Sequence, residues 1–113
     1  GAGAADMLRG LEISLPDGAM RGHIRLKLAE VLENRGALDE AAGYLEKIAV
    51  GPENAELKAL AAVRLGAVLR RLGRGDDALR SYQAAIALEP RGYWGRRAYA
   101  DIQKFFPSLE QLR

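Results

Sequence analysis

An internal repeat of 37 residues constrains the fold of this chain more than any other feature of its sequence. Leu28 and Leu65 occupy matching places in two copies of one pattern, and so do Leu32 and Leu69. The same spacing separates Gly36 from Gly73, Ala41 from Ala78 and Leu45 from Tyr82. A repeat of this length is typical of arrays of stacked supersecondary units. We therefore expect such an array, and 113 residues allow one domain at most.

Each copy of the pattern predicts two amphipathic helices, because its apolar residues recur at spacings of three and four. Alanine and leucine dominate the apolar residues and β-branched residues are few, which also favours helices over strands. Apolar stripes run from Met20 to Leu32, from Leu38 to Ile48, from Leu57 to Leu69 and from Ala78 to Ile86, and a further helix is expected from Gly92 or Tyr93 to Phe105.

Glycine and proline mark the ends of these predicted helices. Gly36 and Gly73 can adopt the left-handed conformation that a helix exit favours. Pro52 cannot continue the second helix and suits the first turn of the third. Such short connections place consecutive helices antiparallel.

The second copy carries a set of small and apolar residues that resembles the tetratricopeptide repeat (TPR) family: Leu65-Gly66, Ala78, Tyr82, Ala85 and Pro90. The first copy keeps Leu28, Ala41 and Leu45 but has Ala29 where Gly is usual and Ile48 where Ala is usual. The period of 37 residues also exceeds the usual 34 of the family, which predicts that the first helix of each unit is longer by about one turn. The resemblance implies an all-α fold, an α-solenoid of antiparallel helix pairs with two full repeats and partial flanking helices.

Four segments are expected on this basis. Residues 17–52 form repeat 1 and residues 53–90 form repeat 2. Residues 1–16 are the tail of a preceding repeat or an N-terminal cap helix, and residues 91–113 are a C-terminal cap or the start of a further repeat. The first six residues lack an initiator methionine and are interpreted as a cloning scar or a cut within a longer protein, a bacterial TPR protein by the resemblance.

Composition removes several classes of function. The sequence has no cysteine, which excludes disulfides and thiol catalysis, and it has no run of 18 apolar residues that would insert into a membrane. His23 is the single histidine and has no obvious acidic partner in a motif. We expect no catalytic residue, no cofactor and no metal. The predicted location is the cytoplasm, with the periplasm as the alternative.

The net charge of +2 hides an asymmetry between the two halves of the protein. Residues 1–57 carry a net charge of −4, whereas residues 58–113 carry +6. The two halves therefore present different electrostatic surfaces, which affects the choice of partner more than the fold.

The resemblance implies a non-enzymatic protein-interaction module, because the first helix of each TPR unit lines a concave face that usually holds the ligand. Leu60, Arg64 and Arg71 share one stripe of the third predicted helix with Val63 and Ala67, apart from the core stripe of Leu65 and Leu69. The partner-binding residues that follow by position are Leu26, Lys27, Glu30 and Glu33 or Asn34, then Leu60, Val63, Arg64, Ala67, Arg70 and Arg71, and finally Arg97 and Asp101.

Three arginines of this set, Arg64, Arg71 and Arg97, predict a basic wall that captures carboxylates, either those of acidic side chains or the terminal carboxylate of a partner. The alternative interpretation is an ordinary solvated face. The carboxylate clamp of TPR co-chaperones is not predicted, because Leu26, Glu30 and Ala67 stand at the comparable places.

Five of the aromatic residues lie within 14 positions near the C-terminus. They could pack the last helix onto the fourth, or Trp94, Phe105 and Phe106 could form an exposed end through which the protein self-associates into a homo-oligomeric scaffold. The basic residues between them also permit nucleic-acid binding. That interpretation is disfavoured, because no nucleic-acid-binding signature accompanies them.

Overall fold

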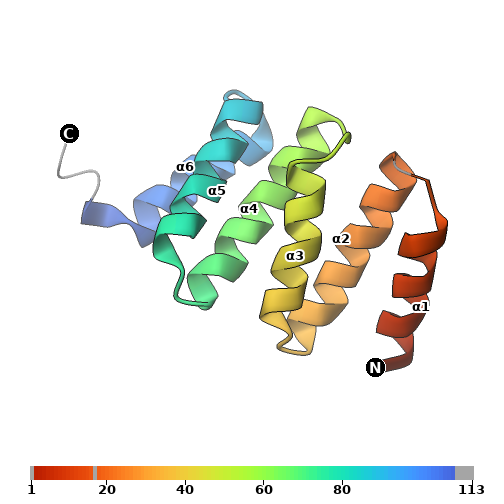
Figure 1. Cartoon of the computed structure of the whole chain (residues 1–113). Helices are drawn as coiled ribbons and strands as arrows, with labels where there is room; N and C mark the ends of the chain where they lie inside the picture. Colours follow the sequence, from red (N-terminus) through yellow and green to blue (C-terminus); the bar gives the residue numbers. More distant parts are fainter. Residues whose placement is uncertain (1, 17, 109–113) are drawn as a thin grey trace.

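The computed structural model describes residues 2–16 and 18–108, and these ranges contain helices and no strand. The all-α fold expected from the sequence is therefore confirmed. The helices lie side by side in the order of the sequence, with α1 and α6 at opposite ends of the stack (Figure 1). They are α1 (Ala2–Ser14), α2 (Ala19–Asn34), α3 (Leu38–Ala49), α4 (Ala55–Arg71), α5 (Gly75–Leu88) and α6 (Tyr93–Phe105).

Two glycines end the first helices of the two predicted repeats, as the sequence indicates. Gly36 and Gly73 have φ angles of 79° and 77°, in the left-handed region where a Cβ atom would be strained. The next backbone N–H in each case reaches back across the helix end: that of Ala37 donates to the Leu32 carbonyl at 2.8 Å, and that of Arg74 to the Leu69 carbonyl at 2.9 Å. These bonds satisfy carbonyls that a helix end would otherwise leave unpaired.

The start of α4 differs from the sequence prediction. Pro52 lies outside the helix, which begins at Ala55, and Asn54 rather than proline sets its first turn. The Asn54 side chain accepts a hydrogen bond from the Leu57 backbone N–H at 2.9 Å. An asparagine in this place stabilises a helix because it satisfies one of the unpaired N–H groups of the first turn.

Contacts between helices give the stack two unlike sides. Helix α4 has Cα atoms within 8 Å of both α2 and α6, whereas no such contact joins α3 to α5 within the described ranges. The helices α2, α4 and α6 therefore converge on one side, and α3 and α5 diverge on the other. This arrangement makes the side of α2, α4 and α6 the inner, concave one. The inner helices α2 and α4, with 16 and 17 residues, are also longer than α3 and α5, with 12 and 14.

The best packed contact joins α4 to α5. Gly66 of α4 lies against the ring of Tyr82, whose side chain is fully buried, and a Cβ atom at Gly66 would come within 2.9 Å of that ring. Next to it, the Ser81 hydroxyl donates to the Ala62 carbonyl at 2.7 Å. One sequence prediction fails in this core: Met20, placed on the apolar stripe of its helix, is 67% exposed. The reason is its position in the first turn of α2, on a side that none of the described helices covers.

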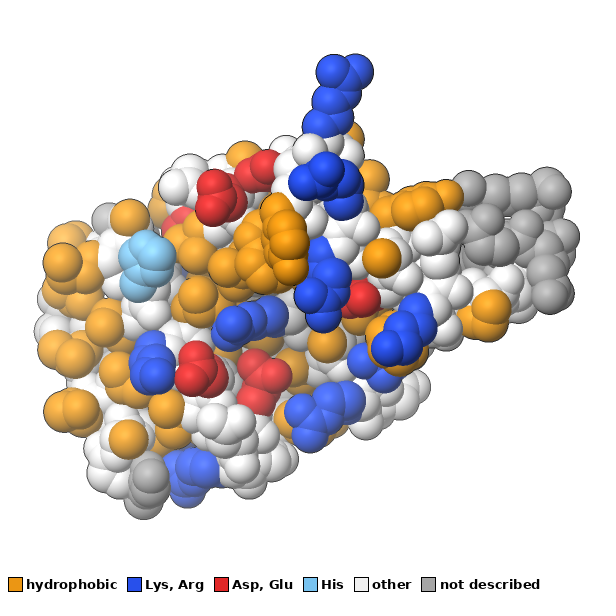
Figure 2. All heavy atoms as spheres, turned by 180° about the vertical axis from the view of Figure 1, so that it is seen from behind, with side chains coloured by type: hydrophobic (Ala, Val, Ile, Leu, Met, Phe, Trp, Pro, Cys, Tyr) orange, Lys and Arg blue, Asp and Glu red, His pale blue; other side chains and the backbone are white. Residues whose placement is uncertain are grey.

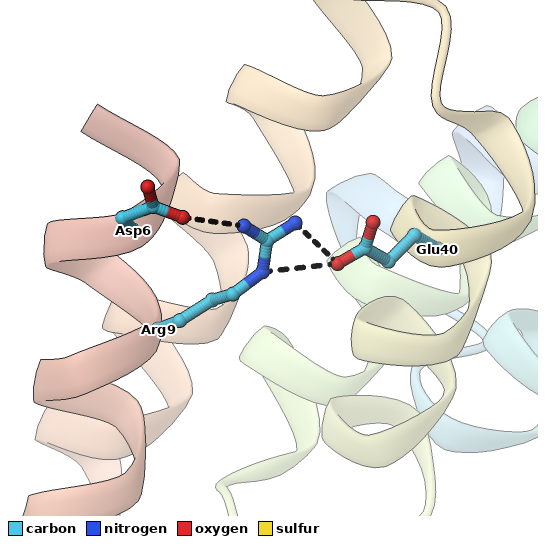
Figure 3. A network of polar contacts seen from close by, with 3 residues as sticks. All are labelled: Asp6, Arg9 and Glu40. Atoms are coloured by element: carbon cyan, nitrogen blue, oxygen red, sulfur yellow. Dashed lines mark hydrogen bonds and ion pairs between the residues drawn. The ribbon is translucent and has the colours of Figure 1, made fainter. Parts of the chain in front are cut away.

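Helix α1 is attached to the stack by charged side chains as well as apolar ones. The buried Glu12 carboxylate accepts a hydrogen bond from the Arg25 Nε of α2 at 2.9 Å and also pairs with Arg21 at 3.4 Å. Arg9 donates from Nε to the Glu40 carboxylate of α3 at 3.0 Å and from Nη1 to Asp6 at 3.1 Å (Figure 3). The Glu12–Arg25 pair has no counterpart in the sequence analysis.

The C-terminal aromatic residues make contacts within the protein itself. Phe106 meets the Tyr82 ring edge to face, with 6.4 Å between ring centroids, and the Arg70 guanidinium lies 3.5 Å from the centre of the Phe105 ring. Trp94 packs partly buried against the core. The outer side of α6 carries both polar and aromatic residues that are exposed, among them Arg96, Tyr99 and Gln103. Of the predicted C-terminal segment, residues 109–113 lie outside the described ranges, as do residues 1 and 17 of the other segments.

Candidate functional site

The concave side holds a hollow where α2 meets α4, and its wall contains both leucines and polar residues. Its volume is about 230 Å³, and Leu26 of α2 faces Leu57 and Leu60 of α4 across it. Ala19, His23, Asn54 and Glu56 complete its wall. Leu26 and Leu60 were predicted to bind a partner, but Leu57 and His23 were not. The signal for both was present in the sequence, since each precedes a predicted residue by three positions on the same helix face.

A second hollow of about 240 Å³ lies between the same two helices and is lined mainly by charged groups. Glu30, Glu33 and Asn34 come from α2, and Arg64 and Ala67 come from α4. Figure 2, which views the molecule from behind relative to Figure 1, shows basic and acidic side chains lying next to one another near the middle of the surface. The structure thus brings together Glu30, Arg64 and Ala67, which were predicted from sequence, with both Glu33 and Asn34, which the sequence offered as alternatives.

The surroundings of Glu33 in this charged hollow change the pKa of its carboxyl group. Its pKa is raised above the ordinary value, chiefly because burial penalises the carboxylate, while the positive charges of Arg64 and Arg71 act in the opposite direction. Glu30 nearby raises the pKa further. The carboxylate of Glu33 is therefore less stable in the folded protein than in the unfolded state.

This shift predicts the pH dependence of a Glu33→Gln variant. Because the folded-state pKa of Glu33 lies above the unfolded value, this group favours folding at low pH, and its contribution is lost as the pH rises through the folded pKa. Glutamine has no charge to desolvate, so we expect the variant to gain stability relative to the wild type between about pH 4 and pH 7. Thermal unfolding followed by circular dichroism at both pH values would measure the difference. If the stability gained by the variant over the wild type became smaller with rising pH, the raised pKa of Glu33 would be contradicted.

Two arginines of the concave side have no ion-pair partner among the described residues. Arg64 and Arg71 influence Glu33 through their charge, yet no carboxylate of these residues lies within ion-pair distance of either guanidinium. Lys27, by contrast, pairs with Glu30 at 3.3 Å on its own helix. On this side, the two guanidinium groups that form no ion pair within the described ranges therefore belong to α4.

Helix α6 places the last two predicted residues, Arg97 and Asp101, next to each other. Arg97 donates from Nε to the Asp101 carboxylate at 3.4 Å. The pKa of the Arg97 guanidinium is raised, first by a hydrogen bond with Tyr93 and then by Asp101. Arg97 is thus already engaged within the protein and differs in this respect from Arg64 and Arg71.

Val63 does not line the concave side as predicted. Its side chain is 5% exposed and belongs to the hydrophobic core. On a helical wheel Val63 shares a wide stripe with Leu60 and Ala67. One edge of this stripe turns towards the core, and Val63 lies at that edge. Arg70, at a similar position, covers the Phe105 ring.

No metal centre and no membrane span is found in the part of the protein that the structure describes. Within residues 2–16 and 18–108, no group of three His, Asp or Glu side chains could hold a metal ion. None of the described helices is long and apolar enough to cross a membrane.

Stacked antiparallel helix pairs with a concave inner side define the class of the protein as a helical-repeat α-solenoid. The chain belongs to the tetratricopeptide repeat-like domain family, whose family model matches residues 2–103. Comparison with curated proteins and with solved structures finds no match. Membership of this family, which is typically non-catalytic, indicates a protein-interaction module in general.

Proposed function

We propose that this domain holds an extended segment of a partner protein across the concave side formed by α2, α4 and α6. The observation that carries the proposal is the pair of guanidinium groups without an ion-pair partner in the described ranges, Arg64 and Arg71, on the same helix as the leucine that lines the first hollow, Leu60. A surface that combines leucine side chains in a hollow with nearby guanidinium groups suits a peptide that offers both apolar and acidic groups.

The spacing of these features along α4 suggests the pattern of the partner segment. Arg64 follows Leu60 by four residues, about 6 Å along the helix, and Arg71 follows by eleven, about 16 Å. An extended peptide advances about 3.3 Å per residue. A segment aligned with α4 would therefore place an apolar side chain in the hollow and carboxylates about two and five residues further on.

Arginine is well suited to this task because its planar guanidinium can bind a carboxylate through two parallel hydrogen bonds. The carboxylates would come from acidic side chains or from the terminal carboxylate of the partner. Glu30 and Glu33 on α2 supply the opposite charge across the groove, so a basic residue of the partner would lie over α2. The surface thus favours one orientation of a partner segment that has acidic residues on the side of α4 and a basic residue on the side of α2.

Reversing the two arginine charges tests the proposal. Fluorescein-labelled peptides that carry a leucine followed by aspartates or glutamates, with neutral and basic versions, would be titrated against the domain. We expect the Arg64→Glu, Arg71→Glu double variant to lose at least about tenfold in affinity for the acidic peptides, because a charge-assisted hydrogen bond contributes about 1.5–3 kcal/mol. Circular dichroism would verify that the variant is folded.

The control is the Arg91→Glu, Arg96→Glu double variant, which changes the net charge equally at exposed positions outside both hollows. It should retain the affinity of the wild type. Equal losses in the two double variants would show attraction to the overall charge of the domain, as for a polyanion such as nucleic acid. That result, or unchanged binding in the Arg64/Arg71 variant, would overturn the proposed site.

A further inference from the structure

A groove lies on the outer side of the stack, where α3 and α5 diverge and α4 passes between them (Figure 1). We call it the outer groove. Its volume of about 450 Å³ exceeds that of each hollow on the concave side, and it shares no lining residue with them. Leu65 and Leu69 of α4 lie at its base, and side chains of α3 and α5 form its two walls.

Small side chains make the walls of the outer groove low. The α3 wall includes Ala42 and Gly43, and a Cβ atom added at Gly43 would meet nothing within 4 Å. On the α5 wall, Ala84 is exposed. Leu65 and Leu69 at the base are each 6% exposed. Another element can therefore approach α4 closely from this side, as when two helices pack with their axes about 8–10 Å apart.

The two walls differ in the charge that they leave open. On α3, Asp39 and Glu46 are exposed and lie seven residues apart, on the same face of the helix. Neither carboxylate forms an ion pair within residues 2–16 and 18–108. On α5, Asp77 pairs with Arg74 at 2.9 Å and also with Arg80, so its charge is compensated on its own helix. The acidic charge that is open to a partner therefore belongs to the α3 wall.

The lining of the outer groove favours a helix over an extended chain. Eight of its fourteen residues are alanine, glycine, valine or leucine. The Ser81 hydroxyl, which could otherwise bond a partner, already donates to the Ala62 carbonyl at 2.7 Å. An extended chain would bring backbone N–H and C=O groups against this surface with few groups to pair them, which costs free energy. A helix pairs its own backbone groups and can present an apolar face.

We propose that the outer groove holds an amphipathic helix of a partner protein, with the apolar face of that helix on α4 and a basic edge along α3. Lysine or arginine side chains on this edge pair with Asp39 and Glu46. These two residues lie about 10 Å apart along α3, because a helix rises about 1.5 Å per residue. A partner helix that runs alongside α3 therefore carries two basic residues about seven positions apart. The segment proposed for the concave side is acidic, so the two sides of the domain suit chemically different partners.

Fluorescence anisotropy with labelled synthetic peptides tests this inference. Peptides of about 18 residues, long enough to form helices, would carry leucine and alanine on one face and two lysines beside it, about four, seven or eleven positions apart. We expect the spacing of seven to bind most tightly and a version with glutamates in these places not to bind. The Asp39→Lys, Glu46→Lys variant should lose at least about tenfold in affinity, because attraction at two positions becomes repulsion. Ala84→Trp fills the groove without a change of charge and should also weaken binding.

The matched control is the Asp6→Lys, Asp76→Lys variant, which changes the net charge equally at exposed positions outside the outer groove. Asp76 lies in the first turn of α5 as Asp39 does in that of α3, so both variants lose a favourable charge at a helix start. The control should keep the affinity of the wild type. The Arg64→Glu, Arg71→Glu variant should lose only the acidic peptides, so a failure of the concave site is distinguished from a failure of the outer groove. Circular dichroism would verify that each variant is folded.

Several outcomes would overturn the proposal. If none of the lysine peptides bound, the groove would have no such occupant. Equal losses in the two lysine double variants would show attraction to the overall charge of the domain. Unchanged binding in both Asp39→Lys, Glu46→Lys and Ala84→Trp would place the peptides on another surface. Self-association of the wild type that Asp39→Lys, Glu46→Lys abolishes, measured by light scattering, would assign the groove to a second copy of the protein.

Discussion

Replacing Glu12 by alanine is expected to lower the free energy of unfolding by about 3–5 kcal/mol, the usual cost of breaking a buried ion pair. The Glu12 carboxylate is buried between α1 and α2, where it accepts a hydrogen bond from the Arg25 Nε at 2.9 Å. Without it, the Arg25 guanidinium would remain buried with no opposite charge. A domain of this size has a total stability of about 5–15 kcal/mol, so the loss would be a large part of it. Urea unfolding followed by circular dichroism measures the change.

The matched variant replaces both partners, Glu12→Met together with Arg25→Met. Two apolar side chains of similar length leave neither charge of the Glu12–Arg25 pair to desolvate. Arg21 also loses the Glu12 carboxylate, but its side chain reaches solvent. This double variant should therefore be much closer to the wild type than Glu12→Ala. The size of the rescue separates the cost of an unpaired charge from the cost of lost packing. A double variant as unstable as Glu12→Ala would show that packing, and not the ion pair, holds α1 in place.

A second large effect is expected at Gly66, where a leucine should destabilise the fold by about 1–3 kcal/mol. Even a Cβ atom here would lie 2.9 Å from the Tyr82 ring, and that ring is fully buried. The helices α4 and α5 would have to move apart, which would also lengthen the hydrogen bond from Ser81 to the Ala62 carbonyl. Chemical denaturation of the variant and the wild type would give the difference in free energy.

Gly43 serves as a control at which an added side chain should stabilise the fold. It lies within α3, is exposed and would have nothing within 4 Å of an added Cβ atom. Gly43→Ala should stabilise the domain by about 0.5–1 kcal/mol, since alanine loses less conformational entropy on entering a helix. A destabilising Gly43→Ala, or a neutral Gly66→Leu, would contradict the packing described for the two helices.

The sequence predicts the helices well because their information is local and repeated. The spacing of Leu28, Leu32, Leu65 and Leu69 indicates the buried faces, and Gly36 indicates a helix exit that the structure shows with a positive φ. The start of α4 was harder to predict. Proline and asparagine both suit that place, and only the structure shows the Asn54 cap.

The candidate site is predicted less completely, since it depends on how helices rotate against one another. Arg64 and Ala67 lie in the charged hollow as expected from their helix face. Val63 is buried because α4 exposes a narrower part of its circumference than the pattern of polar and apolar residues in the sequence suggests. The Glu12–Arg25 pair could not be derived, because it joins residues 13 positions apart on different helices, and no local pattern specifies such a contact.

The sequential contacts of the stack have a consequence for how the protein folds. Within residues 2–16 and 18–108, each helix packs only against helices one or two places away along the sequence. No native contact between these helices therefore requires the closure of a long loop, and the entropy lost in bringing distant segments together stays small. Proteins with such local contacts fold within microseconds to milliseconds. Folding can begin at the tightly packed α4–α5 pair and spread outward, with α1 joining last through its charged contacts.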